Sequence, residues 1–413
     1  MLAKHCNNLF SRILYLQNRT TTSPTALKLI DTEGVELTFK GNKTIQIPFI
    51  WLRDHCRSNK SFNWNTFQRN VDLEKLQQMA KVDEVELEDK VVLESDNQIL
   101  KVNWKDGHIS QFKVEDILRW TNKQNDFWVE KEFWNSTNLK DVQKPMSVDT
   151  LSLSAFYEHF LRFGFATINN VAFNDPDITK QLCQRIATIH NTFFGDFWIF
   201  SNAQDLELVA HADTAYGNDG IDIHTDGTYF AQTPGIQVLH CLRPADEGGE
   251  NVLVDGIGSA EILKKTYPQY FECLTKMKIL HHYKEPCDEK NETGYLSTNI
   301  SPIIEVDETG QIKQIRYNPY DRSPMAIPQN KLGYEDTILF YKSLIQFNSI
   351  LKTPQHMLEL ALKPGTVMFI DNTRVLHARK GFKGKRVMCG AYLSMCGLMA
   401  KAKSLKDVNH NMI

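Results

Sequence analysis

The residues with metal-binding chemistry in this chain are His224 and Asp226, separated by one threonine, and a later His377. Two imidazoles and one carboxylate hold Fe(II) in non-haem oxygenases and leave further coordination positions open. Residues two apart on a β-strand point to the same face, so His224 and Asp226 are expected to reach one metal. The set predicts an iron site and oxygenase chemistry.

The third ligand, His377, must come from a different strand. The alternating, β-branched run 366–370 predicts a strand, and Asp371-Asn372 predicts a turn that leaves His377 just beyond it. A further strand is expected over 386–393. Together with a strand over 235–242, these segments predict a β-rich C-terminal half that positions the three ligands.

Arg386 begins the last of these strands, nine residues after His377. A guanidinium pairs bidentately with a carboxylate, so Arg386 is the candidate anchor for the distal carboxylate of a 2-oxoacid co-substrate. Arg379 competes for this role.

A His-x-Asp triplet alone is a weak signal, because a chain with 13 histidines shows one by chance about once. This chain has a second example, at His211 and Asp213. His224 is preferred because it enters a glycine-punctuated segment that is followed closely by an apolar strand. His240, His281 and His282 are interpreted as structural or solvated.

Several longer motifs resemble the γ-butyrobetaine/trimethyllysine dioxygenase family, whose members are related to taurine dioxygenase. They run in the family's order from about residue 32 to residue 395. The matching stretches are Trp51-Leu-Arg-Asp-His-Cys56, Trp104-Lys-Asp-Gly-His108, Ala212-Asp-Thr-Ala-Tyr216, His224-Thr-Asp-Gly-Thr-Tyr-Phe230, Pro234-Gly-Ile-Gln-Val-Leu-His-Cys241, Gly248-Gly249 with Val254-Asp-Gly256, Arg316-Tyr-Asn-Pro-Tyr-Asp-Arg322, Phe369-Ile-Asp-Asn372 and Arg374-Val-Leu-His377.

The resemblance implies Fe(II), 2-oxoglutarate and O2 as reactants, with ascorbate as reductant. It places iron at His224, Asp226 and His377, and the 2-oxoglutarate anchor at Arg386. Asn251 stands where the family usually has a Thr or Ser that donates to 2-oxoglutarate, and its amide is also a donor.

The family's substrates carry a trimethylammonium group, which donates no hydrogen bond and is best held by aromatic faces. Four aromatic residues resemble the family's cage, with a Phe in place of one Tyr: Phe194, Trp198, Tyr216 and Tyr392. Taken singly, each is more readily interpreted as a core residue. Asp213 and Asn318 match positions near the substrate's polar end, and Asp213 is a candidate partner for an α-ammonium.

Finer motifs, including Asp54-His-Cys-Arg-Ser58 and Tyr317-Asn-Pro-Tyr-Asp-Arg322, are more similar to the trimethyllysine branch. That branch hydroxylates N6,N6,N6-trimethyllysine at C3 with release of succinate and CO2, the first step of carnitine biosynthesis. The alternatives are a γ-butyrobetaine hydroxylase, which acts at the last step, an oxygenase of another betaine, and a binding protein that has lost activity.

The N-terminal 30 residues have the composition of a mitochondrial transit peptide. They contain basic but no acidic residues among 1–30, are rich in Ser and Thr over 20–25, and allow one apolar face. We therefore expect import into the mitochondrial matrix.

The family's small N-terminal domain often binds zinc through three cysteines and a histidine. Cys56 and His108 are present at those positions, but Ser58 and Ser61 replace two cysteines. A structural zinc requires four N/S ligands, so we expect zinc to be absent or weakly bound.

Composition sets the remaining limits. A net charge of −3 without charge runs argues against a nucleic-acid partner, and no apolar stretch approaches a membrane span. Eight scattered cysteines indicate a reducing compartment. The expected partner is a small trimethylammonium substrate, and a homodimer is a family expectation.

The predicted fold is mainly β with flanking helices: a double-stranded β-helix (jelly-roll) catalytic domain and a small N-terminal β-rich domain. The expected divisions are the leader at 1–30, the N-terminal domain at 32–136, a polar linker at 138–145, and the catalytic domain at 145–413. Helices are expected over 114–124, 152–163, 177–190, 258–276 and 334–350.

Overall fold

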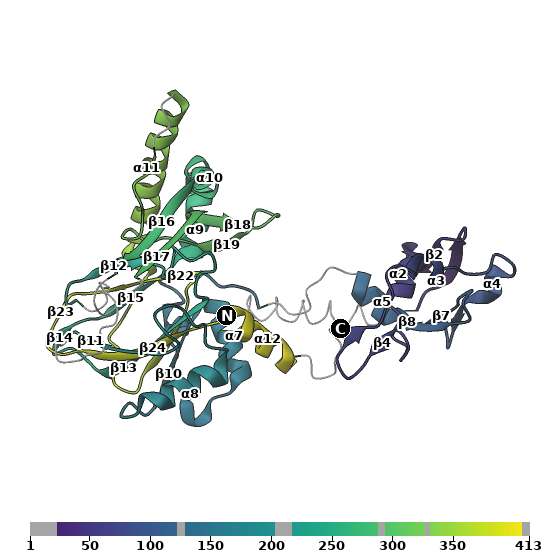
Figure 1. The fold of residues 1–413 in the computed structure, drawn as a ribbon, viewed down its shortest axis with the longest axis horizontal. Helices are drawn as coiled ribbons and strands as arrows, with labels where there is room; N and C mark the ends of the chain where they lie inside the picture. Colours follow the sequence, from purple (N-terminus) through teal and green to yellow (C-terminus); the bar gives the residue numbers. More distant parts are fainter. Residues whose placement is uncertain (1–22, 122–128, 203–216, 288–293, 327–330, 407–413) are drawn as a thin grey trace. The chain divides into compact units, whose positions relative to one another are not determined.

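The computed structural model describes residues 23–121, 129–202, 217–287, 294–326 and 331–406. The chain forms two compact units, one within residues 1–126 and one within residues 127–411. Figure 1 shows the helices and strands of both units, and each unit has its own hydrophobic core. Of the two units, the second contains the predicted iron ligands.

The first unit is built from small antiparallel sheets and short helices. Two three-stranded sheets, β1-β2-β3 and β6-β7-β8, enclose a core that includes Leu37, Leu52, Leu100 and Phe112. The elements are β1 (Ala26–Ile30), β2 (Gly34–Phe39), β3 (Lys43–Pro48), α2 (Phe49–Asp54), β4 (Phe62–Asn63), β5 (Gln68–Arg69), α3 (Leu76–Met79), α4 (Leu87–Lys90), β6 (Val91–Glu94), β7 (Ile99–Asn103), β8 (Ile109–Lys113) and α5 (Val114–Thr121).

The second unit is built around two facing sheets. A six-stranded sheet has the order β11-β24-β13-β21-β10-β9, and a four-stranded sheet has the order β12-β22-β15-β20. Their strands are β9 (Met146–Ser147), β10 (Phe165–Asn169), β11 (Trp198–Ser201), β12 (Ile221–His224), β13 (Ile236–Arg243), β15 (Asn251–Asp255), β20 (Met357–Leu360), β21 (Val367–Asp371), β22 (Val375–Arg379) and β24 (Val387–Leu393). Nearly all pairings are antiparallel, the arrangement of a jelly-roll.

Shorter elements complete this unit. They are α6 (Leu139–Val142), α7 (Leu153–Phe163), α8 (Pro176–Ile186), β14 (Glu247–Gly248), α9 (Gly256–Thr266), α10 (Pro268–Lys276), β16 (Lys278–Glu285), β17 (Tyr295–Pro302), β18 (Ile304–Val306), β19 (Ile312–Ile315), α11 (Lys331–Leu351), β23 (Phe382–Lys383) and α12 (Met395–Lys406). Two one-turn 3-10 helices lie at Val148–Thr150 and Pro354–His356.

Helices cover both outer faces of the sandwich (Figure 1). The helices α7, α8 and α12 bury Phe156, Leu182 and Leu398 against the six-stranded sheet. The helices α9, α10 and α11 pack on the other side with the outer residues of the four-stranded sheet. Apolar side chains such as Leu253 and Met368 fill the space between the sheets. Burial on both faces explains why β21 is apolar up to its final Asp371 and why apolar residues predominate in β13.

Local signals in the sequence place several of these elements correctly. Ser152 and Asp175 cap α7 and α8 through side-chain oxygens that accept backbone N–H groups, as expected of N-cap residues. The predicted helix over 258–276 is two helices, because Pro268 ends the backbone hydrogen bonding of α9 and starts α10. The helix predicted over 177–190 ends at Ile186.

The domain boundaries differ from the expected ones at two places. The last five residues of the predicted leader form β1, which pairs along its whole length with β2. Residues 129–136 belong to the second unit, where Trp134 is buried and donates from Nε1 to the carbonyl of Phe163. The predicted linker contains α6, whose Val142 is buried in the same core. Residues 1–22 of the predicted leader lie outside the described residues.

Candidate active site

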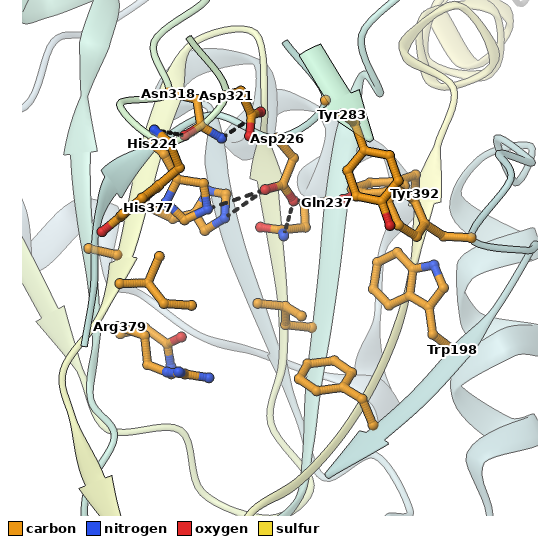
Figure 2. Close-up of a pocket in the computed structure, with 18 of the residues that line it drawn as sticks. Trp198, His224, Asp226, Gln237, Tyr283, Asn318, Asp321, His377, Arg379 and Tyr392 are labelled. Carbon is orange, nitrogen blue, oxygen red and sulfur yellow. Dashed lines mark hydrogen bonds and ion pairs between the residues drawn. The ribbon is translucent and has the colours of Figure 1, made fainter. Parts of the chain in front are cut away.

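The predicted iron ligands meet in one cavity of the second unit. One nitrogen each from His224 and His377 and one oxygen of Asp226 lie within 4.8 Å of one another. Nε2 of His224 is 3.3 Å from Asp226 Oδ1, and Nε2 of His377 is 3.5 Å from the same oxygen (Figure 2). Among the described residues this is the one such cluster of His, Cys, Asp and Glu.

Strand pairing brings the two histidines together. β12 pairs with β22 so that His224 lies directly opposite His377, and a register shift between Ile221 and His224 re-aims the end of β12. Their ring centroids are 4.2 Å apart. His377 lies in β22, just beyond the turn predicted at Asp371-Asn372.

Asp226 is not on the strand with His224, contrary to the expected His-x-Asp strand geometry, because β12 ends at His224. The side chain of Asn372 holds the backbone of Asp226 instead: its Oδ1 accepts from Asp226 N at 2.8 Å, and its Nδ2 donates to Asp226 O at 3.0 Å. The chain then turns at Gly227, whose φ of +66° disfavours other residues.

Further hydrogen bonds fix the donor atoms. Nδ1 of His224 donates to the carbonyl of Asp222 at 2.7 Å, which leaves its Nε2 lone pair directed at the centre of the triad. The other oxygen of Asp226, Oδ2, accepts from Gln237 Nε2 and, at 2.8 Å, from the hydroxyl of Tyr392. Asp226 therefore offers one oxygen, Oδ1, to a metal.

The electrostatics favour an ionised carboxylate. Burial alone would raise the pKa of Asp226, but the adjacent His377 and His224 hold that pKa well below its usual range. Burial and the neighbouring His224 lower the pKa of His377, a shift that favours the neutral imidazole needed for metal coordination. Two imidazoles and one carboxylate around open space fit Fe(II), and these three residues would hold it.

The cavity of about 190 Å³ around the triad also contains the predicted 2-oxoglutarate groups. Arg386 and Asn251 line it, and both are buried. Among the described residues, the Arg386 side chain has no carboxylate partner. Burial lowers the pKa of Arg386. Nδ2 of Asn251 is also without an acceptor there. A buried cation and a buried donor directed at one cavity fit an anionic ligand.

The structure distinguishes the two arginine candidates. Arg379 also lines the cavity, but its Nη2 donates to the carbonyls of Gly217 and Asp219 at 2.7 and 2.8 Å. Arg379 thus binds the segment that leads into β12, and Arg386 stays the predicted anchor for 2-oxoglutarate.

Three of the four predicted cage residues line the cavity: Phe194, Trp198 and Tyr392. The rings of Trp198 and Tyr392 meet edge to face with centroids 4.9 Å apart (Figure 2). Trp198 lies across β24 because position 390 is glycine; a Cβ there would approach the indole to 2.7 Å. Tyr216 and Asp213 lie outside the described residues, and their predicted roles are untested.

Other residues that line the cavity were not predicted from the sequence, among them Gln237, Tyr283, Tyr320 and Asp321. The predicted Asn318 lines it as well, but its side chain is used by the protein, since Nδ2 donates to Asp321 Oδ2 at 2.8 Å and Oδ1 accepts from Tyr320 N. The sequence could have indicated Gln237, because it is a polar residue within the largely apolar segment that forms β13. It could not have indicated Tyr283, because this residue lies on β16, which no motif in the sequence connects with the site.

The histidines interpreted as structural are not part of the triad. His240 and His281 are fully buried and His282 is partly buried. His240 bonds to Thr179 Oγ1, and His282 bonds to Ser323 Oγ.

In the first unit, the family's zinc positions converge. Nε2 of His108 lies 3.3 Å from both Cys56 Sγ and Ser58 Oγ, and Ser61 hydrogen bonds to the same thiol. The four side chains surround one point, but two are hydroxyls, which are poor zinc ligands.

Comparisons with known proteins agree with this geometry. Residues 131–392 match the model of the taurine catabolism dioxygenase TauD, TfdA family. The chain belongs to that family. Residues 28–94 match the model of the γ-butyrobetaine hydroxylase-like N-terminal domain. The protein is therefore a 2-oxoglutarate-dependent dioxygenase, and the family implies Fe(II) and 2-oxoglutarate.

Full-length relatives carry a more specific name. Mitochondrial trimethyllysine dioxygenase of Mus musculus is 31% identical over 96% of this chain and 91% of its own length. The Homo sapiens protein of that name is 33% identical over 88% and 84%. A solved taurine dioxygenase from Burkholderia xenovorans is 14% identical, with a TM-score of 0.42 over 61% of this chain and 83% of its own. The resemblance found by sequence analysis is confirmed.

Proposed function

We propose that this protein hydroxylates N6,N6,N6-trimethyllysine at C3. The reaction converts one C–H bond to C–OH and consumes O2 and 2-oxoglutarate, with release of succinate and CO2. The observation that carries the proposal is the His224–Asp226–His377 triad, which lies in one cavity with a buried arginine and several aromatic faces. The names of the full-length relatives support the substrate.

Each group has a role in this reaction. Arg386 and Asn251 bind 2-oxoglutarate, and His224, Asp226 and His377 would hold Fe(II). The bound metal supplies the activation of O2 and the oxidative decarboxylation of 2-oxoglutarate. The protein positions the substrate's C3 and excludes water, and Gln237 and Tyr392 orient the carboxylate of Asp226.

The trimethylammonium is held by the aromatic walls Phe194, Trp198 and Tyr392, with Tyr283 as a further wall. The rings of Phe194 and Tyr283 meet edge to face, with centroids 5.3 Å apart. A quaternary ammonium is attracted to aromatic faces and loses no hydrogen bond on burial.

We further propose that the protein acts in the mitochondrial matrix, at the first step of carnitine biosynthesis, and as a homodimer. The leader composition supports this location, as do the mitochondrial relatives. None of the helices within the described ranges has the length and hydropathy needed to cross a bilayer.

A γ-butyrobetaine hydroxylase is the second candidate, supported by the match of residues 28–94 to that enzyme's N-terminal domain model. Mass spectrometry of aerobic reactions of the full chain with Fe(II), ascorbate and 2-oxoglutarate separates the two. Preferential gain of one oxygen by trimethyllysine is expected. Preference for γ-butyrobetaine would overturn the substrate assignment, and absence of succinate with either compound would overturn the reaction.

A further inference from the structure

Charge is distributed unevenly around the cavity. Figure 2 shows Arg379 and Asp321 on opposite sides of the triad. Among the described residues that line the cavity, two carry carboxylates, Asp226 and Asp321. Asp226 would bind the metal, so of these two carboxylates Asp321 is the one placed to contact a substrate.

Asp321 is held in a defined orientation. Its Oδ2 accepts from Asn318 Nδ2 at 2.8 Å and from the hydroxyl of Thr228 at 3.0 Å. Its backbone carbonyl accepts from the N–H of His282 in β16 at 2.8 Å. These hydrogen bonds hold the Asp321 carboxylate in one orientation at the wall of the cavity.

The segment that carries Asp321 is tied directly to the iron ligands. Thr225, between His224 and Asp226, donates its backbone N–H to the carbonyl of Tyr317 at 2.7 Å. Its hydroxyl accepts from the N–H of Tyr317 at 3.1 Å. Arg316 extends this connection by donating to the carbonyls of Phe230 and Ala231. The position of Asp321 relative to the metal site is thus fixed by short-range bonds.

We propose that Asp321 binds the α-ammonium of the substrate and selects an amino acid over a simple betaine. This inference rests on the proposed function. The trimethylammonium needs no acceptor and lies at the aromatic walls, whereas an α-ammonium has three N–H donors and requires an acceptor when it is buried. γ-Butyrobetaine has a carboxylate and no ammonium at that end, so Asp321 repels it. Specificity then arises from attraction and repulsion at one residue.

The test compares two substrates that differ only at the α-carbon: trimethyllysine and 6-(trimethylammonio)hexanoate, which lacks the amino group. Asp321→Asn keeps the shape and removes the charge. We expect its kcat/KM for trimethyllysine to fall about 10- to 100-fold, mainly through KM, because a charge-assisted hydrogen bond is lost. The value for the deaminated compound should not fall, and should rise, because Asp321 attracts no ammonium in it and its carboxylate is no longer repelled.

Two further variants make the result specific. Glu359→Gln removes a charge from an exposed pair with Lys380, outside the cavity, and should change neither substrate's kinetics. Thr228→Val removes one of the donors that orient Asp321. Its kcat/KM for trimethyllysine should fall less than that of Asp321→Asn, and its kcat/KM for the deaminated compound should again not fall. It also keeps the proposal testable if Asp321→Asn does not fold.

Equal losses on both substrates, in Asp321→Asn or in Thr228→Val, would assign Asp321 a structural role and overturn the inference, as would unchanged kinetics. A wild-type enzyme that acts equally on trimethyllysine and its deaminated analogue would also overturn it, while the proposed function stands. A wild-type enzyme that oxidises neither would overturn the proposed function itself.

Discussion

The hydroxyl of Tyr392 donates a hydrogen bond of 2.8 Å to Oδ2 of Asp226, so one wall of the cavity is bonded to an iron ligand. Gln237 donates to the same oxygen. Together they leave Oδ1 as the oxygen that faces His224 and His377. Tyr392 was predicted as a cage residue, and the structure adds this second contact.

Loss of either donor should weaken metal binding. We expect Tyr392→Phe or Gln237→Leu to lower the affinity for Co(II), used as a probe for Fe(II), about 10-fold or more, as for other residues that orient metal ligands. Calorimetric titration of Co(II) into the purified protein measures this directly. Tyr341→Phe, on an exposed side chain of α11, is the matched control. Unchanged affinity in both test variants would show that Asp226 needs no orienting donor.

Removal of a triad ligand should be more severe. His224→Ala or Asp226→Ala should abolish turnover and Co(II) binding, because each removes one of three donor groups that lie within 4.8 Å. Succinate formation and metal titration are the two measurements. Full activity in either variant would refute the iron assignment.

Arg386 should determine the affinity for 2-oxoglutarate. We expect Arg386→Ala to raise the KM for 2-oxoglutarate about 100-fold, because the bound carboxylate would lose its buried cation. Arg386→Lys should recover only part of this loss, since an ammonium lacks the bidentate fork. Succinate formation at varied 2-oxoglutarate provides the values. An unchanged KM in Arg386→Ala would transfer the role to Arg379.

The iron ligands could be predicted because local chemistry determines them. His-x-Asp, a second histidine and a following arginine are visible in the sequence, as are the apolar strands β13 and β21. The prediction was wrong about where Asp226 sits, because the side chain of Asn372, 146 residues away, positions its backbone beyond the end of β12.

The remaining cavity residues could not be predicted, because long-range pairing places them there. Tyr283 belongs to β16, which pairs with β17. The sequence between these two strands, residues 286–294, is too long to be a two-residue hairpin turn and so did not predict the pairing. Asp321 reaches the cavity only because Thr225 binds the segment after β19. No spacing rule in one sequence reports such contacts.

The first unit allows a gain-of-function test of the zinc prediction. Wild-type protein should contain no stoichiometric zinc. The double substitution Ser58→Cys and Ser61→Cys should create a four-ligand site with Cys56 and His108, because these positions already surround one point. Elemental analysis after dialysis measures both proteins. Stoichiometric zinc in the wild type would refute the prediction, and Ser58→Cys alone is the three-ligand control.

Stability should depend on pH through His240, which is buried and has Nδ1 2.7 Å from Thr179 Oγ1. Burial lowers the pKa of His240 to about 4, whereas the pKa of an unfolded histidine is about 6.5. Between these values the unfolded chain binds more protons than the folded one. The free energy of unfolding should therefore fall as the pH decreases from 6.5 towards 4, by about 1.4 kcal/mol per pH unit.

Urea denaturation of wild type and His240→Gln at pH 7.5, 6.5 and 5.5 isolates this contribution. Below pH 6.5 the free energy of unfolding of the variant should fall less steeply with decreasing pH. The difference in slope should be that of one bound proton, about 1.4 kcal/mol per pH unit. Burial, with Arg316 and Arg322 nearby, also lowers the pKa of His281 to about 4, so this histidine should keep some pH dependence in the variant. Identical slopes in the two proteins would mean that His240 takes up its proton in the folded state at no cost, and its burial between the helix α8 and the sheet would then need another explanation.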